Sequence, residues 1–90
     1  MHGVVVNGTI HDFEQARNFL RQEVIPPLSQ APGFVTAHWV RLSESIGTSM
    51  LIFESEEAAQ AGAEQIKSNP PPGDAITIDS VVIGEVVEQA

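Results

Sequence analysis

Asn7 and His38 are polar residues on segments that are otherwise strand-like. Both side chains could take part in chemistry. Asn7 follows three valines, and burying its amide without partners would cost roughly 1–3 kcal/mol. The amide therefore either bonds to backbone or a neighbouring strand, or donates to an oxygen atom of a ligand. Histidine is the side chain that changes charge near neutral pH, so His38 could transfer a proton, unless it lies at the surface or in an interface. Both are predicted catalytic residues.

Two further residues near these segments could bind a ligand. Trp39 follows His38, and adjacent residues on a strand point to opposite faces, so at most one of the two can face a pocket. The residue type favours a dimer-interface role for Trp39, but the sequence does not assign which of His38 and Trp39 faces the pocket. Arg17 lies beside the apolar stripe of the first predicted helix and could meet an anionic substrate, or its charged head could remain in water.

Several classes of site have no support in the chain. His2, His11 and His38 lack the spacing of metal ligands and there is no cysteine, so we expect no metal site and no disulfide. Neither a nucleophile elbow nor a glycine-rich phosphate loop is present. A formal net charge of −8 disfavours nucleic acid and anionic membranes. No apolar run approaches the roughly 20 residues of a membrane span. We expect a cytoplasmic protein without a cofactor.

The elements that must position these residues follow from hydrophobic spacing and turn residues. The first helix begins after the N-cap Asp12. It should bend or end near Val24 and restart briefly, because Pro26 and Pro27 lack backbone donors. Ser55 should cap the second helix. The loop at 43–47 is too short for a parallel crossover, so the strands beside it form an antiparallel hairpin. The order βαββαβ predicts an α+β fold with both helices on one face of a four-stranded antiparallel sheet. The predicted strands are 4–10, 34–42, 48–54 and about 75–87, and the helices start at 13 and 56.

Neighbouring residues, and not only alternate ones, are apolar in these strands, as in Val4-Val5-Val6 and Met50-Leu51-Ile52-Phe53. Continuous apolar runs are typical of strands that are buried on both faces. Two helices can cover only one face of the sheet. A chain of 90 residues would most cheaply cover the other face with a second copy, so we expect a homodimer through the sheet.

Three local features resemble the dimeric α+β barrel superfamily, in the branch named for antibiotic biosynthesis monooxygenases. They are Ala31-Pro32-Gly33-Phe34 before the second strand, the polar hairpin around Gly47, and the Phe53-Glu54-Ser55-Glu56-Glu57-Ala58 junction. The resemblance covers nearly the whole chain and implies a single ferredoxin-like domain over 1–90. It also implies a pocket between helices and sheet, in which some members oxidise small aromatic molecules without metal or flavin.

The resemblance also includes a branch that degrades haem, with an asparagine on the first strand, a tryptophan before the acidic-serine turn and an iron-binding histidine on the second helix. Asn7 matches the first position. Phe53 replaces the tryptophan, and the helix from Glu56 to Lys67 has no histidine. Haem degradation is therefore not expected.

Two classes of function remain open. In the first, a cofactor-independent monooxygenase binds a small aromatic or apolar molecule, with Asn7 orienting a substrate oxygen, His38 moving a proton, and Phe53 and Arg17 completing the pocket. In the second, the chain is a non-catalytic homodimer that binds a small molecule or serves as a scaffold. The small residues Ala59, Gly62 and Ala63 favour the second class, because close packing of the second helix leaves less pocket volume.

Overall fold

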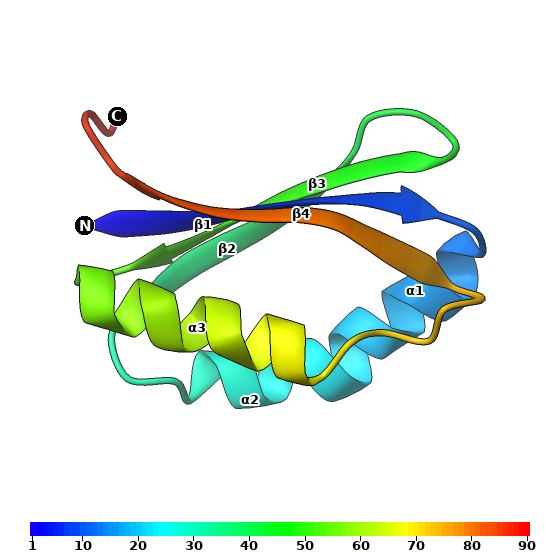
Figure 1. The fold of residues 1–90 in the computed structure, drawn as a ribbon, viewed down its shortest axis with the longest axis horizontal. Helices are drawn as coiled ribbons and strands as arrows, with labels where there is room; N and C mark the ends of the chain where they lie inside the picture. The colour runs from blue at the N-terminus through cyan, green and yellow to red at the C-terminus, as the bar shows by residue number, and fades with distance from the viewer.

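The computed structural model describes all residues, 1–90, and has one four-stranded sheet with every helix on the same side (Figure 1). This confirms the predicted order and layers. The first helical region is one continuous arm, residues 13–29, built from three consecutive segments. The elements are β1 (His2–Ile10), α1 (Phe13–Phe19), η1 (Leu20–Val24), α2 (Ile25–Ser29), β2 (Phe34–Arg41), β3 (Ile46–Phe53), α3 (Glu56–Ser68) and β4 (Ile76–Glu85).

The sheet is antiparallel throughout, with the strand order β2-β3-β1-β4. Its register is set by the central pair, in which Val4 lies opposite Leu51 on β3 and opposite Ile83 on β4. The register between β1 and β4 shifts between Asn7 and Gly8, which marks a β-bulge. This register determines which residue of each strand faces the helices.

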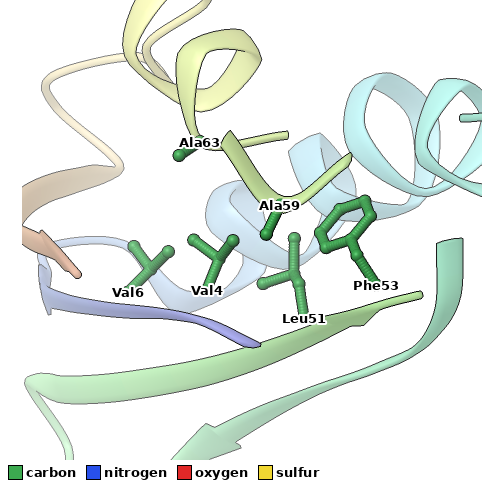
Figure 2. Packing of buried hydrophobic residues seen from close by; sticks show 6 residues of the cluster. All are labelled: Val4, Val6, Leu51, Phe53, Ala59 and Ala63. Carbon is green, nitrogen blue, oxygen red and sulfur yellow. The ribbon is translucent and has the colours of Figure 1, made fainter. Parts of the chain in front are cut away.

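The core lies between α3 and the two central strands (Figure 2). Ser55 caps α3 by accepting a hydrogen bond from the Ala58 amide at 3.1 Å, as its sequence predicts. Gly62 faces the ring of Phe53 so closely that a Cβ atom there would lie 2.5 Å from Cζ. The stripe of small residues therefore lets α3 approach the sheet, as expected. The six buried core residues are Val4, Val6, Leu51, Phe53, Ala59 and Ala63.

The helical arm packs much less tightly than α3. Its N-cap, Asp12, accepts a hydrogen bond from the Gln15 amide at 3.1 Å. In the arm only Ala16 is buried. The helix type changes after Val24, where a bend and a brief restart were predicted. The arm is π-helical in η1, where the Ile25 amide donates to the Leu20 carbonyl, and restarts as the five-residue helix α2 at Ile25. Pro26 and Pro27 lack amide protons and crowd the preceding turn, and the wider π turn accommodates their rings.

The face of the sheet that points away from the helices carries apolar side chains without cover in a single protomer. The exposed fractions are 49% for Val40, 49% for Met50 and 58% for Val82, which come from three different strands. One side of the sheet is therefore packed and the other is open, as Figure 1 shows. An uncovered apolar face of this kind is typical of an interaction surface.

Candidate functional site

A cleft of about 1520 Å³ lies between the helical arm and the sheet. Its floor is formed by the helix-facing residues of the sheet, and its walls by the arm and by α3. It exists because α3 packs directly on the central strands, whereas the arm leaves its apolar residues half-exposed or exposed over the sheet. The cleft exceeds the roughly 300–1,000 Å³ of common ligand sites. It is therefore open to a small molecule and not filled by the chain's own side chains.

Trp39 is the aromatic side chain on the floor of this cleft. It lies opposite Ser49 on β3, and Ser49 lies opposite Val6, which belongs to the helix-facing core. The prediction that Trp39 lies in a dimer interface is therefore wrong. The β2 strand carries apolar residues in both alternating sets, so its sequence does not indicate which set faces the helices.

Arg41 follows two residues after Trp39 on the same face of β2 and lies at the mouth of the cleft. Its guanidinium carbon is 4.0 Å from the ring centre of Phe13, the first residue of α1. Its Nη2 atom also donates to the Glu44 carbonyl at 3.1 Å. These contacts connect the end of β2 to the start of the arm. Arg41 was not predicted as a site residue from the sequence. The signal that could indicate it is a basic residue, rare in this acidic chain, at the end of an apolar strand.

All three arginines of the chain, Arg17, Arg21 and Arg41, line the cleft. No arginine has a carboxylate within 4.0 Å, since the one ion pair of the protein joins His2 and Glu56 at 3.5 Å. Arg17 is thus placed where its predicted contact with an anionic substrate is possible. Arg21, one turn further along the arm, is exposed and also lines this cleft.

Asn7 lies on the outer face of the sheet, on the opposite side from the cleft. Its Oδ1 accepts a hydrogen bond from Thr48 Oγ1 at 2.8 Å, and its Nδ2 donates to Ser80 Oγ at 3.1 Å. The amide therefore bonds to both neighbouring strands, which is the structural alternative raised by the sequence. The pocket role proposed for Asn7 does not fit this position, because Val4 and Val6 take the helix-facing positions of β1.

His38 also lies on the outer face, opposite Met50 on β3, and is exposed. It has no hydrogen-bonding partner in the protomer and does not line the cleft. Since β3 separates β2 from β1, His38 and Asn7 share a face but stand on strands that are not neighbours. The structure does not bring the two predicted catalytic residues together at the cleft.

Phe53 is fully buried and belongs to the core beneath α3. Its ring packs edge-on against Phe34, with centroids 5.9 Å apart. It is absent from the lining of the cleft, so its predicted role as a pocket wall does not fit. A residue just before the acidic turn is drawn into the core here because Gly62 leaves room for its ring.

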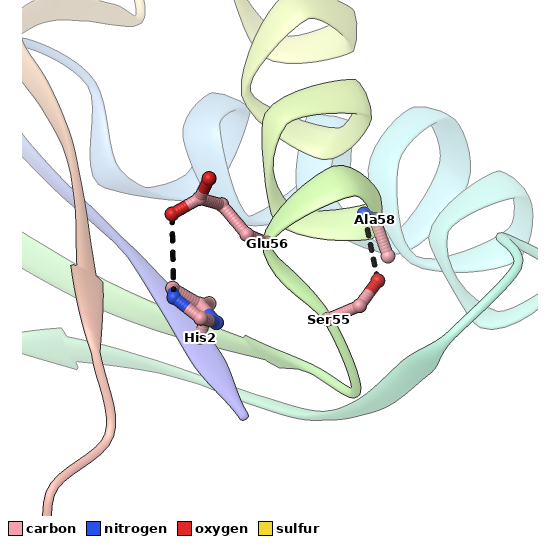
Figure 3. A network of polar contacts seen from close by, with 4 residues as sticks. All are labelled: His2, Ser55, Glu56 and Ala58. Carbon is pink, nitrogen blue, oxygen red and sulfur yellow. Dashed lines mark hydrogen bonds and ion pairs between the residues drawn. The ribbon is translucent and has the colours of Figure 1, made fainter.

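The other two histidines, His2 and His11, lie at the start of β1 and just after its end. His2 Nε2 pairs with Glu56 at the start of α3 (Figure 3), and its buried Nδ1 has no partner. His11 Nε2 is 2.8 Å from Thr77 Oγ1. No histidine lines the cleft, and no three His, Cys, Asp or Glu side chains form a group that could hold a metal ion. No helix is long and apolar enough to cross a membrane.

The sequence matches no protein-family model and no curated protein. Among solved structures the chain resembles HapK from Hahella chejuensis, with a TM-score of 0.68, 12% identity and coverage of 100% of this chain and 96% of HapK. It also resembles SnoaB, a cofactor-independent oxygenase from Streptomyces nogalater, with a TM-score of 0.64, 14% identity and coverage of 98% and 94%.

A third similar structure is a dimeric ferredoxin-like protein from an uncultured marine organism, with a TM-score of 0.62, 15% identity and coverage of 100% and 98%. The chain therefore has a ferredoxin-like fold. This confirms the fold predicted from the sequence. At these identities the comparisons establish the fold, and the fold alone does not determine the reaction.

One of the similar structures binds haem. The haem degrader MhuD from Mycobacterium tuberculosis, solved with two haems in its active site, matches with a TM-score of 0.58, 23% identity and coverage of 97% and 98%. In the present chain α3 carries no histidine and no histidine lines the cleft. The residues of the cleft therefore do not fit a histidine-ligated haem.

Proposed function

We propose that the chain is a small cofactor-independent monooxygenase that acts on aromatic molecules bound in the cleft. The observation that carries this proposal is the half-buried Trp39 on the floor of an open cleft between the arm and the sheet. An open cleft favours the enzyme over a scaffold whose pocket is filled by its own side chains. The presence of a cofactor-independent oxygenase among the structures of the same fold supports it.

The lining of the cleft supports a flat aromatic substrate, and we propose one that can lose a proton to form an anion. An indole ring provides a flat apolar surface on which an aromatic ring can stack. The carbon to be oxidised would be a CH₂ group activated by an adjacent phenolic ring system. Loss of one proton makes this carbon an electron-rich anion, which Arg41 and Arg17 can stabilise. The carboxylates that line the cleft and could accept the proton are Glu23, Glu54 and Glu57.

The reaction needs molecular oxygen as its oxidant. The substrate anion reduces O₂ and forms a carbon–oxygen bond, and the resulting peroxide anion takes back the first proton to give a hydroperoxide. Loss of the second proton from the same carbon cleaves the oxygen–oxygen bond and leaves a carbonyl group. One oxygen atom enters the product and the other leaves as water, so the substrate is oxidised to a quinone-type ketone.

The second face of the sheet supports a homodimer. Val40, Met50 and Val82 expose large apolar surfaces there, and a similar structure of the same fold is dimeric. A second copy placed face to face would bury them and convert two open sheets into a barrel-like core. Asn7 would then lie within the interface, where its bonds to Thr48 and Ser80 keep its amide satisfied. The whole chain acts as one domain in this assembly, and its lack of cysteine suits the cytoplasm.

The test is oxygen uptake with 1,8-dihydroxyanthrone, a phenolic ring system with one activated CH₂ group. Protein treated with a chelator should consume oxygen and form the anthraquinone faster than buffer does. Trp39→Ala should raise KM about tenfold, since an aromatic pair contributes up to roughly 1.5 kcal/mol. Lys67→Ala, on the last turn of α3 and outside the cleft, is the matched control. Binding without turnover would instead support the non-catalytic small-molecule-binding dimer.

A further inference from the structure

We propose that the natural ligand of the cleft carries a fixed anionic group, such as a carboxylate, attached to its aromatic ring system. Arg41 binds this group, and Arg17 and Arg21 add positive charge on the opposite wall. The inference rests on the proposed use of the cleft as the substrate site. It goes further by naming a charge that the substrate has before any proton is removed.

The first support is the distribution of charge over the molecule. The chain has twelve acidic and four basic side chains, yet all three arginines line the cleft. Three glutamates line it as well, so the formal charges at the cleft cancel. The whole excess of eight negative charges lies elsewhere. The cleft thus repels an anion less than the rest of the chain does on average.

The second support is that these arginines have no acidic partner. In a chain with three times as many acids as bases, no arginine approaches a carboxylate within 4.0 Å. An arginine that serves only stability or solubility has ample opportunity to pair in such a chain. Unpaired guanidinium groups on a cleft wall keep their donors free for a carboxylate of the ligand.

The third support is the fixed position of Arg41. Its guanidinium group lies over the Phe13 ring and donates one hydrogen bond to the Glu44 carbonyl. A guanidinium group has five N–H donors in a planar fork, so the remaining edge can still bind a carboxylate with two hydrogen bonds. The contact with Phe13 holds the fork in place before the ligand arrives, which reduces the entropic cost of binding.

The fourth support is the spacing of Trp39 and Arg41. The two residues are two positions apart on one face of β2, which separates their Cα atoms by about 7 Å at the rise of a strand. A ring stacked on Trp39 can therefore direct a substituent towards Arg41. A fused aromatic ring system with a carboxylate at its end matches this arrangement of a flat apolar surface followed by a cation.

The experiment compares 2-naphthoate with its uncharged counterpart 2-naphthamide. Trp39 is the sole tryptophan and the chain has no tyrosine, so its fluorescence reports directly on the cleft, with titration calorimetry as a second readout. We expect 2-naphthoate to bind at least about tenfold more tightly, as for hydrogen bonds to charged groups. Arg41→Gln should remove this preference, Arg41→Lys should retain part of it, and Lys67→Gln should leave it unchanged. Thermal melts of each variant verify that it is folded.

Equal affinity for the two probes would overturn the anionic ligand. A preference that persists in the triple variant Arg17→Gln, Arg21→Gln, Arg41→Gln would also overturn it. If the two probes bind equally while 1,8-dihydroxyanthrone is still oxidised, the inference fails and the proposed monooxygenase stands. If neither probe binds and oxygen is not consumed, both fail.

Discussion

The guanidinium group of Arg41 lies 4.0 Å from the ring centre of Phe13 and so links the end of β2 to the first turn of α1. This contact spans the mouth of the cleft, since both residues line it. It restrains an arm that has little burial of its own, because only Ala16 is buried along its whole length. The contact between Arg41 and Phe13 therefore helps to hold the arm over the cleft.

Removing either partner of this contact should destabilise the fold slightly. The effects of the two substitutions should not be additive, because both remove the same contact. Phe13→Leu and Arg41→Gln should each lower the free energy of unfolding, and the coupling between them should be about 0.5–1 kcal/mol, as for cation–π pairs near the surface. A double-mutant cycle in urea measures this coupling. Strictly additive effects would mean that the arm does not depend on the contact.

Close packing of α3 makes Gly62 intolerant of even one methyl group. A Cβ atom at this position would lie 2.5 Å from Phe53 Cζ. Alanine normally stabilises a helix relative to glycine by about 1 kcal/mol, but overpacking costs about 1–3 kcal/mol. Gly62→Ala should therefore lower stability. Gly73→Ala, in the loop before β4, is the control, since a Cβ atom added there would meet no other atom within 4 Å.

The stability of both glycine variants is measured by urea unfolding at one protein concentration. We expect Gly73→Ala to stay close to the wild type and Gly62→Ala to unfold at a lower urea concentration. A Gly62→Ala protein as stable as the wild type would show that α3 can move away from the sheet, and that Phe53 is less tightly confined.

The outer face of the sheet should control assembly. Val82 and Met50 are both about half exposed in the protomer and lie in the same row across β4, β1 and β3. Met50→Lys should place a charge in the proposed interface, where burying it without a partner is costly. Light scattering should then show a monomer, while Glu88→Lys, near the C-terminus, should remain dimeric. A wild-type chain that is monomeric at micromolar concentration would contradict the proposed assembly.

Asn7 should matter for the sheet and not for ligand binding. Asn7→Ala removes two side-chain hydrogen bonds, to Thr48 and Ser80, each worth about 0.5–1.5 kcal/mol when well formed. We expect lower stability and an unchanged affinity for 2-naphthoate in the fluorescence titration. A variant that folds and dimerises but no longer binds would restore a direct role for this amide.

The layers and strand order could be predicted because each signal is local. Asp12 and Ser55 cap helices within three residues of their own position, and the short loop before Ile46 permits only a hairpin. The face of each residue could not be predicted in the same way. Strands with apolar residues on both faces have no alternation that distinguishes inside from outside. The sequence therefore does not assign a face to Trp39, and its pocket role for Asn7 falls on the wrong side of the sheet.

The cleft itself also lies beyond what the sequence indicates. Pro26 and Pro27 predicted an interruption of the first helix, but the chain continues through a π-helical segment that carries Leu20 and Arg21 along the cleft wall. The two prolines are compatible with a break and with a wider turn, so the sequence does not choose between them. Likewise, the contact between Arg41 and Phe13 joins residues from separate elements, and no local pattern reveals it.

Oxygen uptake with 1,8-dihydroxyanthrone, compared across three variants, is the most direct test that aromatic substrates react in the cleft and not on the outer face. Trp39→Ala should raise KM about tenfold by loss of ring stacking, while Asn7→Ala and His38→Ala should retain the wild-type kinetics. Activity that survives unchanged in Trp39→Ala but disappears in Asn7→Ala or His38→Ala would contradict the location of the site.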